Sequence, residues 1–212
     1  MRDADHWPEV AESSNALRSA GASYHRIGCH TIPLVHQLVT SLPWLIPGIA
    51  VALVVGVLAG GRVGAWLGCH RVLAALLLFS LGVIVAGTLT PLAADEVLPP
   101  EARATCDLSR TRLATPIDLL TRDDVLLNIL LFMPFGFAIG SIPWSSRKVA
   151  LTIGAIALPF LIEGVQLTVL SLGRGCQSAD VIDNLTGLVI GFCAGTPISW
   201  WTSPARRGRA GG

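Results

Sequence analysis

Charged residues are scarce in this sequence. Asp, Glu, Lys and Arg make up only 14% of its 212 residues, and the formal net charge is +1. No basic cluster occurs before the C-terminal tail ARRGRAGG. Because nucleic-acid binding depends on Lys and Arg that contact phosphates, this composition indicates no nucleic-acid partner. The polar stripes of a soluble helical protein are missing too, since the stretch VLAALLLFSLGVIVAGTLT is apolar on all sides.

Motifs for catalysis and metal binding are also missing. The sequence has no G-x-S-x-G nucleophile elbow and no glycine-rich loop that would cradle a phosphate. Its five cysteines include no C-x-x-C pair, which argues against a zinc site. We therefore predict no metal and no cofactor. Whether the protein is an enzyme stays open, and a role without catalysis is favoured.

Long apolar runs dominate instead. Hydrophobic residues make up 52% of the chain, and the mean hydropathy is +0.63. A hydrocarbon core about 30 Å thick is crossed by roughly 20 apolar residues. The stretches near that length are 43–61, 72–91, 125–143, 149–171 and 181–200. The sequence therefore predicts an all-α, polytopic membrane helix bundle of about five transmembrane helices.

The transmembrane bundle is expected to occupy residues 43–202. A polar N-terminal segment, 1–42, precedes it, and a basic C-terminal tail, 203–212, follows it. The N-terminal segment lacks a charged region followed directly by an apolar core, so we expect no cleavable signal peptide.

Basic residues beside the spans predict the orientation, because Lys and Arg are retained on the cytoplasmic side. With the C-terminus inside, the short cytoplasmic segments contain Arg62, Arg71, Arg147 and Lys148. The arginines of the opposite side lie mostly in the long polar loop 92–124, which carries less weight in this rule. We therefore expect the N-terminus outside and the C-terminus inside.

Polar residues recur near one end of the last three predicted spans. Asn128 lies about one helical turn into the third span, at ~1.5 Å per residue. The fourth span runs back toward that end, and the fifth span begins there. This places polar groups of three spans at one level near the outer membrane face. The predicted functional cluster consists of Asn128, Glu163, Gln166, Arg174, Asp180, Asp183 and Asn184.

Glycines repeat every four residues in two of these spans, a spacing that allows close helix packing. They are Gly136, Gly140, Gly187, Gly191 and Gly195. The glycines of the fifth span continue the helix face that carries Asp180 and Asp183. The polar groups are therefore predicted to point into the bundle.

Glu163 must be protonated, paired or reached by water, because a carboxylate at the membrane centre costs at least roughly 2.5–3.5 kcal/mol. Arg174 is the predicted partner, since Gly173 and Gly175 flank it and allow a tight reversal back to the bundle. The alternative is a purely structural cluster. Interhelical hydrogen bonds contribute around 0.6 kcal/mol each on average, and such residues then only specify assembly.

The long polar loop has two further features. It ends in Asp123 and Asp124, which are expected to stabilise the positive N-terminal end of the third helix. It also contains Cys106, which lies on the same predicted side of the membrane as Cys176. A disulfide between them would tie the loop to the cluster, and the sequence leaves this pairing open.

Several of these motifs occur together, in this order, in one known family. The stretch NILLFMPFG from Asn128, the stretch IEGVQ with Glu163, the following Arg174 and the stretch SADVIDNLTGLVIG resemble the VanZ-like family of bacterial membrane proteins. The last stretch departs slightly from the family pattern, since Asn184 directly follows Asp183. The resemblance covers residues 85–200 and does not include the first span.

The resemblance implies a multi-pass protein of the bacterial plasma membrane, acting in the cell envelope. Founding members of the family are associated with resistance to the lipoglycopeptide antibiotic teicoplanin. A contribution to glycopeptide resistance through the polar cluster is therefore expected. The implied partners are membrane lipids together with a lipid-anchored envelope molecule or a lipoglycopeptide.

Two alternatives stay open. The first is an intramembrane enzyme acting on a lipid-linked envelope substrate, with Glu163 or Asp183 as general base and Arg174 binding a phosphate or an oxyanion. The second is a small transporter. Five spans without a detectable inverted repeat give this alternative little support.

Overall fold

The computed structural model describes residues 40–94, 96–103 and 105–202. The predicted N-terminal segment lies almost entirely outside these ranges, and the predicted basic tail lies wholly outside them. The bundle consists of five long helices: α3 (Leu45–Leu67), α4 (Arg71–Thr88), α7 (Asp123–Ser141), α8 (Ser146–Thr168) and α9 (Ser178–Thr202). Each contains a stretch long and apolar enough to cross a membrane. The predicted all-α membrane bundle is confirmed.

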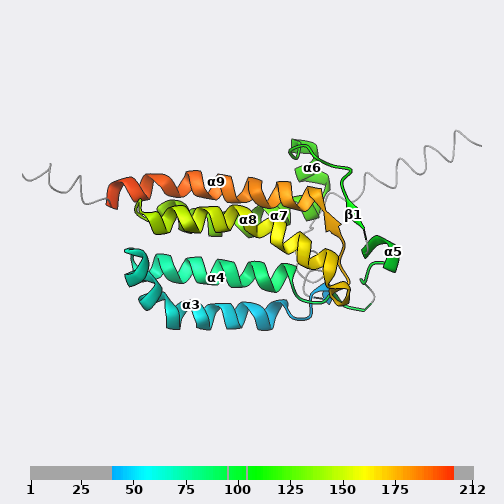
Figure 1. Ribbon diagram of the computed structural model, residues 1–212, viewed down its shortest axis with the longest axis horizontal. Helices are drawn as coiled ribbons and strands as arrows, with labels where there is room; N and C mark the ends of the chain where they lie inside the picture. The colour runs from blue at the N-terminus through cyan, green and yellow to red at the C-terminus, as the bar shows by residue number, and fades with distance from the viewer. Residues whose placement is uncertain (1–39, 95, 104, 203–212) are drawn as a thin grey trace, which may run out of the picture. The chain divides into compact units, whose positions relative to one another are not determined.

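The short elements lie between the long helices. They are α5 (Pro100–Arg103), β1 (Cys106–Asp107), α6 (Pro116–Thr121), the 3-10 helix η1 (Leu170–Leu172) and β2 (Cys176–Gln177). The two strands pair in parallel, with Cys106 opposite Cys176. Figure 1 shows these elements gathered at the end of the bundle where α9 begins. We call this the cluster end.

The last three long helices begin earlier than the apolar pattern predicts. α7 starts at Asp123, so both acidic residues of the predicted cap lie in its first turn. α8 starts after Ser145, whose hydroxyl accepts a hydrogen bond from the backbone N–H of Lys148. In α8 this hydroxyl satisfies a free N–H group of the first turn, and the helix extends beyond its apolar segment.

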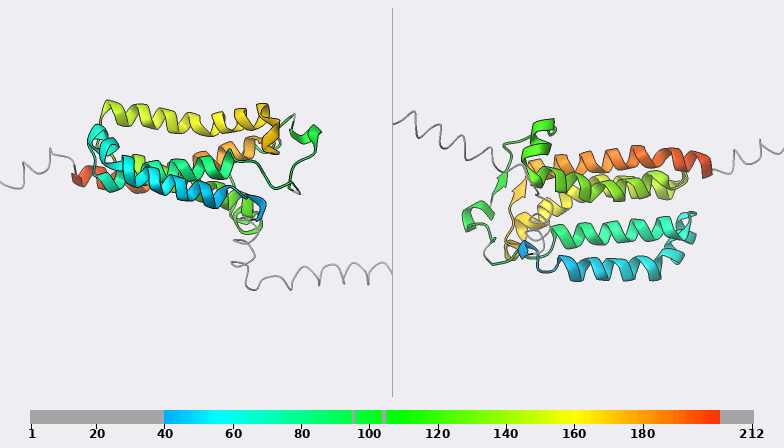
Figure 2. Two further views of the ribbon diagram at one scale, coloured as in Figure 1. Left: turned by 90° about the horizontal axis from the view of Figure 1, so that it is seen from below. Right: turned by 180° about the vertical axis from the view of Figure 1, so that it is seen from behind.

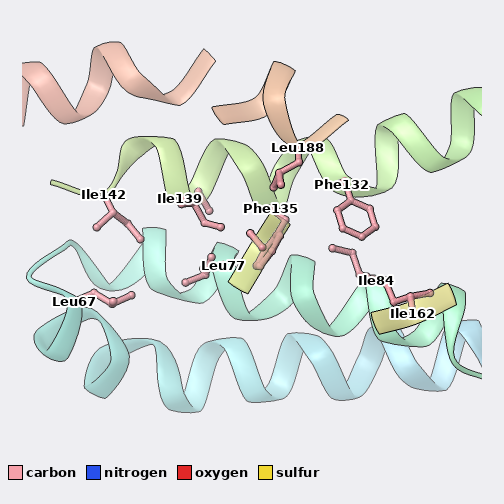
Figure 3. Packing of buried hydrophobic residues seen from close by; sticks show 11 residues of the cluster. Leu67, Leu77, Ile84, Phe132, Phe135, Ile139, Ile142, Ile162 and Leu188 are labelled. Atoms are coloured by element: carbon pink, nitrogen blue, oxygen red, sulfur yellow. The ribbon is translucent and has the colours of Figure 1, made fainter. Parts of the chain in front are cut away.

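Two tight helix pairs build the bundle, α3 with α4 and α7 with α9. The left view of Figure 2 shows α8 as a separate layer, away from α3, and α8 packs against α9. A buried apolar core lies among α4, α7, α8 and α9. Figure 3 shows Phe132, Ile84 and Ile162 meeting in it near the cluster end.

The α7–α9 pair is packed backbone to backbone. A Cβ atom added to Gly187 or Gly191 would overlap the carbonyl oxygen of Ile129 or Met133 on α7. All glycines expected to pack helices lie at this contact: Gly136, Gly140, Gly187, Gly191 and Gly195. Small residues at these points let the two backbones approach closely, and this approach places the first turn of α9 against α7.

Lys148 differs from its predicted place in a cytoplasmic loop. It lies in the first turn of α8 and is buried. Its Nζ donates hydrogen bonds to the carbonyl oxygens of Gly140 at 2.7 Å and Ile142 at 2.9 Å. These carbonyls are at the C-terminus of α7, where acceptors lack helical partners and a cation is favoured. Lys148 therefore caps α7 at the end of the bundle opposite to the cluster end.

Candidate functional site

The predicted polar residues lie at the cluster end. Asn128 belongs to the second turn of α7, and Glu163 and Gln166 belong to the last turns of α8. Asp180 and Asp183 lie in the first turns of α9. We keep the name polar cluster for the seven predicted residues: Asn128, Glu163, Gln166, Arg174, Asp180, Asp183 and Asn184. Asn128 and Asp180 contact each other directly. Others bind backbone groups or a residue outside the predicted cluster.

Asp180 and Asn128 connect α9 to α7. The Nδ2 of Asn128 donates a hydrogen bond of 2.8 Å to Oδ1 of Asp180. Both residues are about one turn into their helices. The close packing of α7 against α9 at their glycines sets the register between the two helices. This is the one direct side-chain hydrogen bond between polar-cluster residues in the described part of the chain.

Asp183 pairs with an arginine that sequence reasoning missed. The Nη2 of Arg110 donates to Oδ2 of Asp183 and, at 3.2 Å, to the carbonyl oxygen of Ala179. Both side chains of the ion pair are buried, with 9% of Arg110 and 1% of Asp183 exposed. Arg110 comes from the long polar loop, 73 residues away in sequence. Nothing in the spacing of the loop arginines distinguishes it from Arg112, which is exposed.

A disulfide and a hydroxyl hold Arg110 in place. Cys106 and Cys176 form a disulfide, so the pairing that the sequence left open is present. The Oγ of Ser178, the first residue of α9, donates to the carbonyl oxygen of Arg110 at 2.8 Å. The loop segment is thus attached to the start of α9 on both sides of residues 107–109, and the Arg110 side chain reaches Asp183.

The predicted ion pair between Glu163 and Arg174 is not among the ion pairs of the described residues. Oε2 of Glu163 instead accepts a hydrogen bond of 2.7 Å from the backbone N–H of Gln177. Glu163 therefore anchors the segment leading into α9. The spacing of side chains does not indicate which backbone N–H groups are free, so this contact could not be predicted from it.

Arg174 and Gln166 bind the C-terminal end of α4. The guanidinium of Arg174 donates to the carbonyl oxygens of Gly87 at 2.8 Å and Thr90 at 3.5 Å. Gln166 Nε2 donates to the carbonyl oxygen of Thr88 at 2.9 Å. The last carbonyls of a helix carry partial negative charge and lack helical donors. These two side chains therefore connect α4 to the polar cluster.

The charge of Arg174 persists in this environment. Burial lowers the pKa of Arg174 below its ordinary value, whereas the nearby carboxyl groups of Asp180 and Glu163 oppose that shift. Because the ordinary pKa of arginine lies far above neutrality, the guanidinium stays protonated. A fixed positive charge therefore lies near the buried carboxyl group of Glu163 and the half-buried carboxyl group of Asp180.

Several buried polar atoms of the site have no hydrogen-bond partner in the described part of the chain. Nε and Nη1 of Arg110, Oδ1 of Asp183 and Oδ1 of Asn184 have no hydrogen-bond partner within residues 40–94, 96–103 and 105–202. Asn184 is 1% exposed. The site thus has buried donors on one residue and buried acceptors on two adjacent residues. Within the same ranges, no group of three His, Cys, Asp or Glu side chains is arranged to hold a metal ion.

The disulfide gives a direct test of this geometry. Reduction of the denatured protein is expected to add two maleimide adducts, because Cys106 and Cys176 are released. The adducts are counted by the mobility shift of a maleimide polymer on a gel. Cys106→Ser should expose Cys176 without reduction. Equal adduct numbers with and without reduction in the wild type would rule out the pairing.

Comparison with known proteins gives one match. A family model described as VanZ/LLP1 matches residues 72–198. No curated protein and no solved structure matches the chain significantly. The matched range runs from the start of α4 almost to the end of α9 and excludes α3. It contains the whole polar cluster, Arg110 and both cysteines of the disulfide.

Proposed function

Because the chain belongs to the VanZ/LLP1 family and has five helices long and apolar enough to cross a membrane, we propose that it binds an envelope ligand in its polar cluster. The binding takes place at the outer face of the bacterial plasma membrane. The ligand is a lipid-anchored envelope molecule or the lipoglycopeptide itself. The consequence is protection against antibiotics of the teicoplanin type.

The proposal rests on the buried hydrogen-bonding atoms of Arg110, Asp183 and Asn184 that lack partners among the described residues. A buried polar group without a partner costs about 1–3 kcal/mol, and four atoms of Arg110, Asp183 and Asn184 have no partner among the residues that the structure describes. A cluster that served only to join helices would satisfy its own donors and acceptors. A ligand with both hydroxyl or amine donors and anionic or carbonyl acceptors would complement these atoms.

The disulfide supports the outer-face location. Disulfides persist in oxidising compartments and are rare in the cytosol, and Cys106–Cys176 lies at the cluster end. This agrees with the orientation expected from the basic residues, in which the C-terminus is inside.

Antibiotic susceptibility tests the proposal. A susceptible bacterial host expressing the wild type is expected to tolerate more teicoplanin, with unchanged vancomycin tolerance. Glu163→Gln and Asp183→Asn should lose the protection, because each removes the charge of a buried carboxylate in the cluster. The readout is the minimal inhibitory concentration, with membrane levels matched by immunoblot.

Glu101→Gln is the matched control, because Glu101 is an exposed carboxylate of α5 outside the cluster. It should protect as well as the wild type. If all variants protect equally, the carboxylates only join helices. If the wild type does not protect, the resistance role is wrong for this chain.

The purified protein distinguishes recognition from catalysis. Binding of an envelope lipid without turnover is the expected result. Turnover that is lost in Glu163→Gln would instead assign the site to an intramembrane enzyme.

A further inference from the structure

Four large apolar side chains are strongly exposed in the loop between β1 and α7. Leu108, Leu113, Ile117 and Leu120 lie between β1 and α7, with 66% to 86% of each exposed. We call these four residues the loop patch. Scattered exposed apolar residues are normal, whereas several within one short segment indicate a surface that something covers.

The sequence around α6 builds this patch. Thr115 caps the helix in a capping box with Asp118, and Pro116 occupies its first turn. Ile117 and Leu120 are three residues apart, so they share one face of the turn. Asp118 lies on another face, where it binds Thr115 and Arg112. These hydrogen bonds hold the pKa of Asp118 well below its usual range, so its carboxylate stays charged there. The segment is therefore amphipathic.

The position of α6 indicates what covers the patch. Only Arg122 separates the end of α6 from the start of α7, the next membrane-spanning helix. α6 contacts α7. Figure 1 and the right view of Figure 2 show α6 to the side of the bundle, level with the first turns of α9. α5 lies farther out along the bundle axis. The first turns of membrane-spanning helices lie near the boundary between headgroups and acyl chains.

We propose that the loop patch inserts into the membrane leaflet at the cluster end, with lipid at the headgroup and acyl-chain boundary as its partner. α7, which α6 contacts, also exposes the apolar side chains of Leu126 and Leu130. Amphipathic segments bind such boundaries with their apolar face buried in the lipid.

This insertion has a consequence for the site. Arg110 lies in the chain between Leu108 and Leu113, so lipid contacts flank the residue that pairs with Asp183. The lipid therefore holds this loop against α9 together with the disulfide. The inference is independent of the proposed resistance role, because it depends only on the membrane around the bundle.

Fluorescence quenching in lipid nanodiscs tests the insertion. Leu120→Cys is labelled with the polarity-sensitive fluorophore NBD, in unreduced protein that carries Cys29→Ser, Cys69→Ser and Cys193→Ser. Since Leu120 is 86% exposed, the substitution disturbs no packing. The discs contain phosphatidylcholine and phosphatidylglycerol, with or without lipid that carries a nitroxide near the top of its acyl chain. Glu101→Cys in the same background is the aqueous control.

The expected result is blue-shifted emission at position 120, strong quenching by the nitroxide lipid and weak quenching by iodide. Position 101 should show the reverse. Strong iodide quenching at position 120 would overturn the proposal, because the patch would then face water. Blue-shifted emission without nitroxide quenching would also overturn it, because a protein surface, such as a second copy of this chain, would then cover the patch.

Discussion

Arg110→Ala is expected to destabilise the protein by about 3–5 kcal/mol, the usual cost of removing one partner of a buried ion pair. The substitution leaves the carboxylate of Asp183 buried, with only 1% of its side chain exposed, and removes its ion pair with Arg110. It also removes the donor to the carbonyl oxygen of Ala179 in the first turn of α9. The free energy of unfolding, measured by circular dichroism during denaturation in mixed micelles, gives the size of the effect.

Arg112→Ala is the matched control in the same loop. Arg112 pairs with Asp118 at 2.9 Å, but 59% of its side chain is exposed, so the loss should be about 0–1 kcal/mol. Combining Arg110→Ala with Asp183→Asn should recover part of the lost stability, because the uncompensated charge is gone. Equal small effects of Arg110→Ala and Arg112→Ala would show that the buried pair does not hold the loop.

Substitution of Gly191 should disrupt the α7–α9 pair. A Cβ atom at this position would overlap the carbonyl oxygen of Met133 and lie 2.8 Å from the backbone nitrogen of Phe137. Backbone atoms cannot rotate away as a side chain can, so the helices must separate. We expect Gly191→Ala to cost about 1–3 kcal/mol, the range for overpacking. Gly191→Leu should prevent the native pairing, which thermal unfolding in micelles would detect as a lower midpoint or a lost transition.

Gly154→Ala provides the comparison. Gly154 lies inside α8, and a Cβ atom added there meets nothing within 4 Å. The substitution should be neutral or stabilising by up to roughly 0.5–1 kcal/mol, because alanine loses less conformational freedom than glycine in a helix. If Gly191→Ala and Gly154→Ala behave alike, the close approach of α7 and α9 is not needed for stability.

The amino-acid sequence alone determined the membrane class, the five spans and the end of the bundle where polar groups gather. These properties follow from the length of apolar runs and from helical spacing, because the apolar thickness of a bilayer sets the depth of each residue along a span. The position of Asn128 beside Asp180 is of this kind. Both residues lie about one turn from the start of their helices, and both helices begin at the same end.

The partners of the charged groups were decided only by the tertiary structure. Arg110 lies 73 residues before Asp183 in a loop without periodicity, so no spacing rule could select it from the other loop arginines. Glu163 and Arg174 bind backbone groups, the N–H of Gln177 and the carbonyl oxygen of Gly87. Almost every residue has a backbone N–H and a carbonyl group, so the sequence does not show which of them lack a partner in the backbone.

The physical reason is that a sequence pattern gives a residue's depth and helix face but not the rotation of one helix against another or the path of a loop. Here the glycine contact of α7 with α9 sets the rotation, and the disulfide sets the path of the loop. Together they bring Arg110 to Asp183. The sequence therefore determined which end of the bundle carries the site, and the packing decided which residues form it.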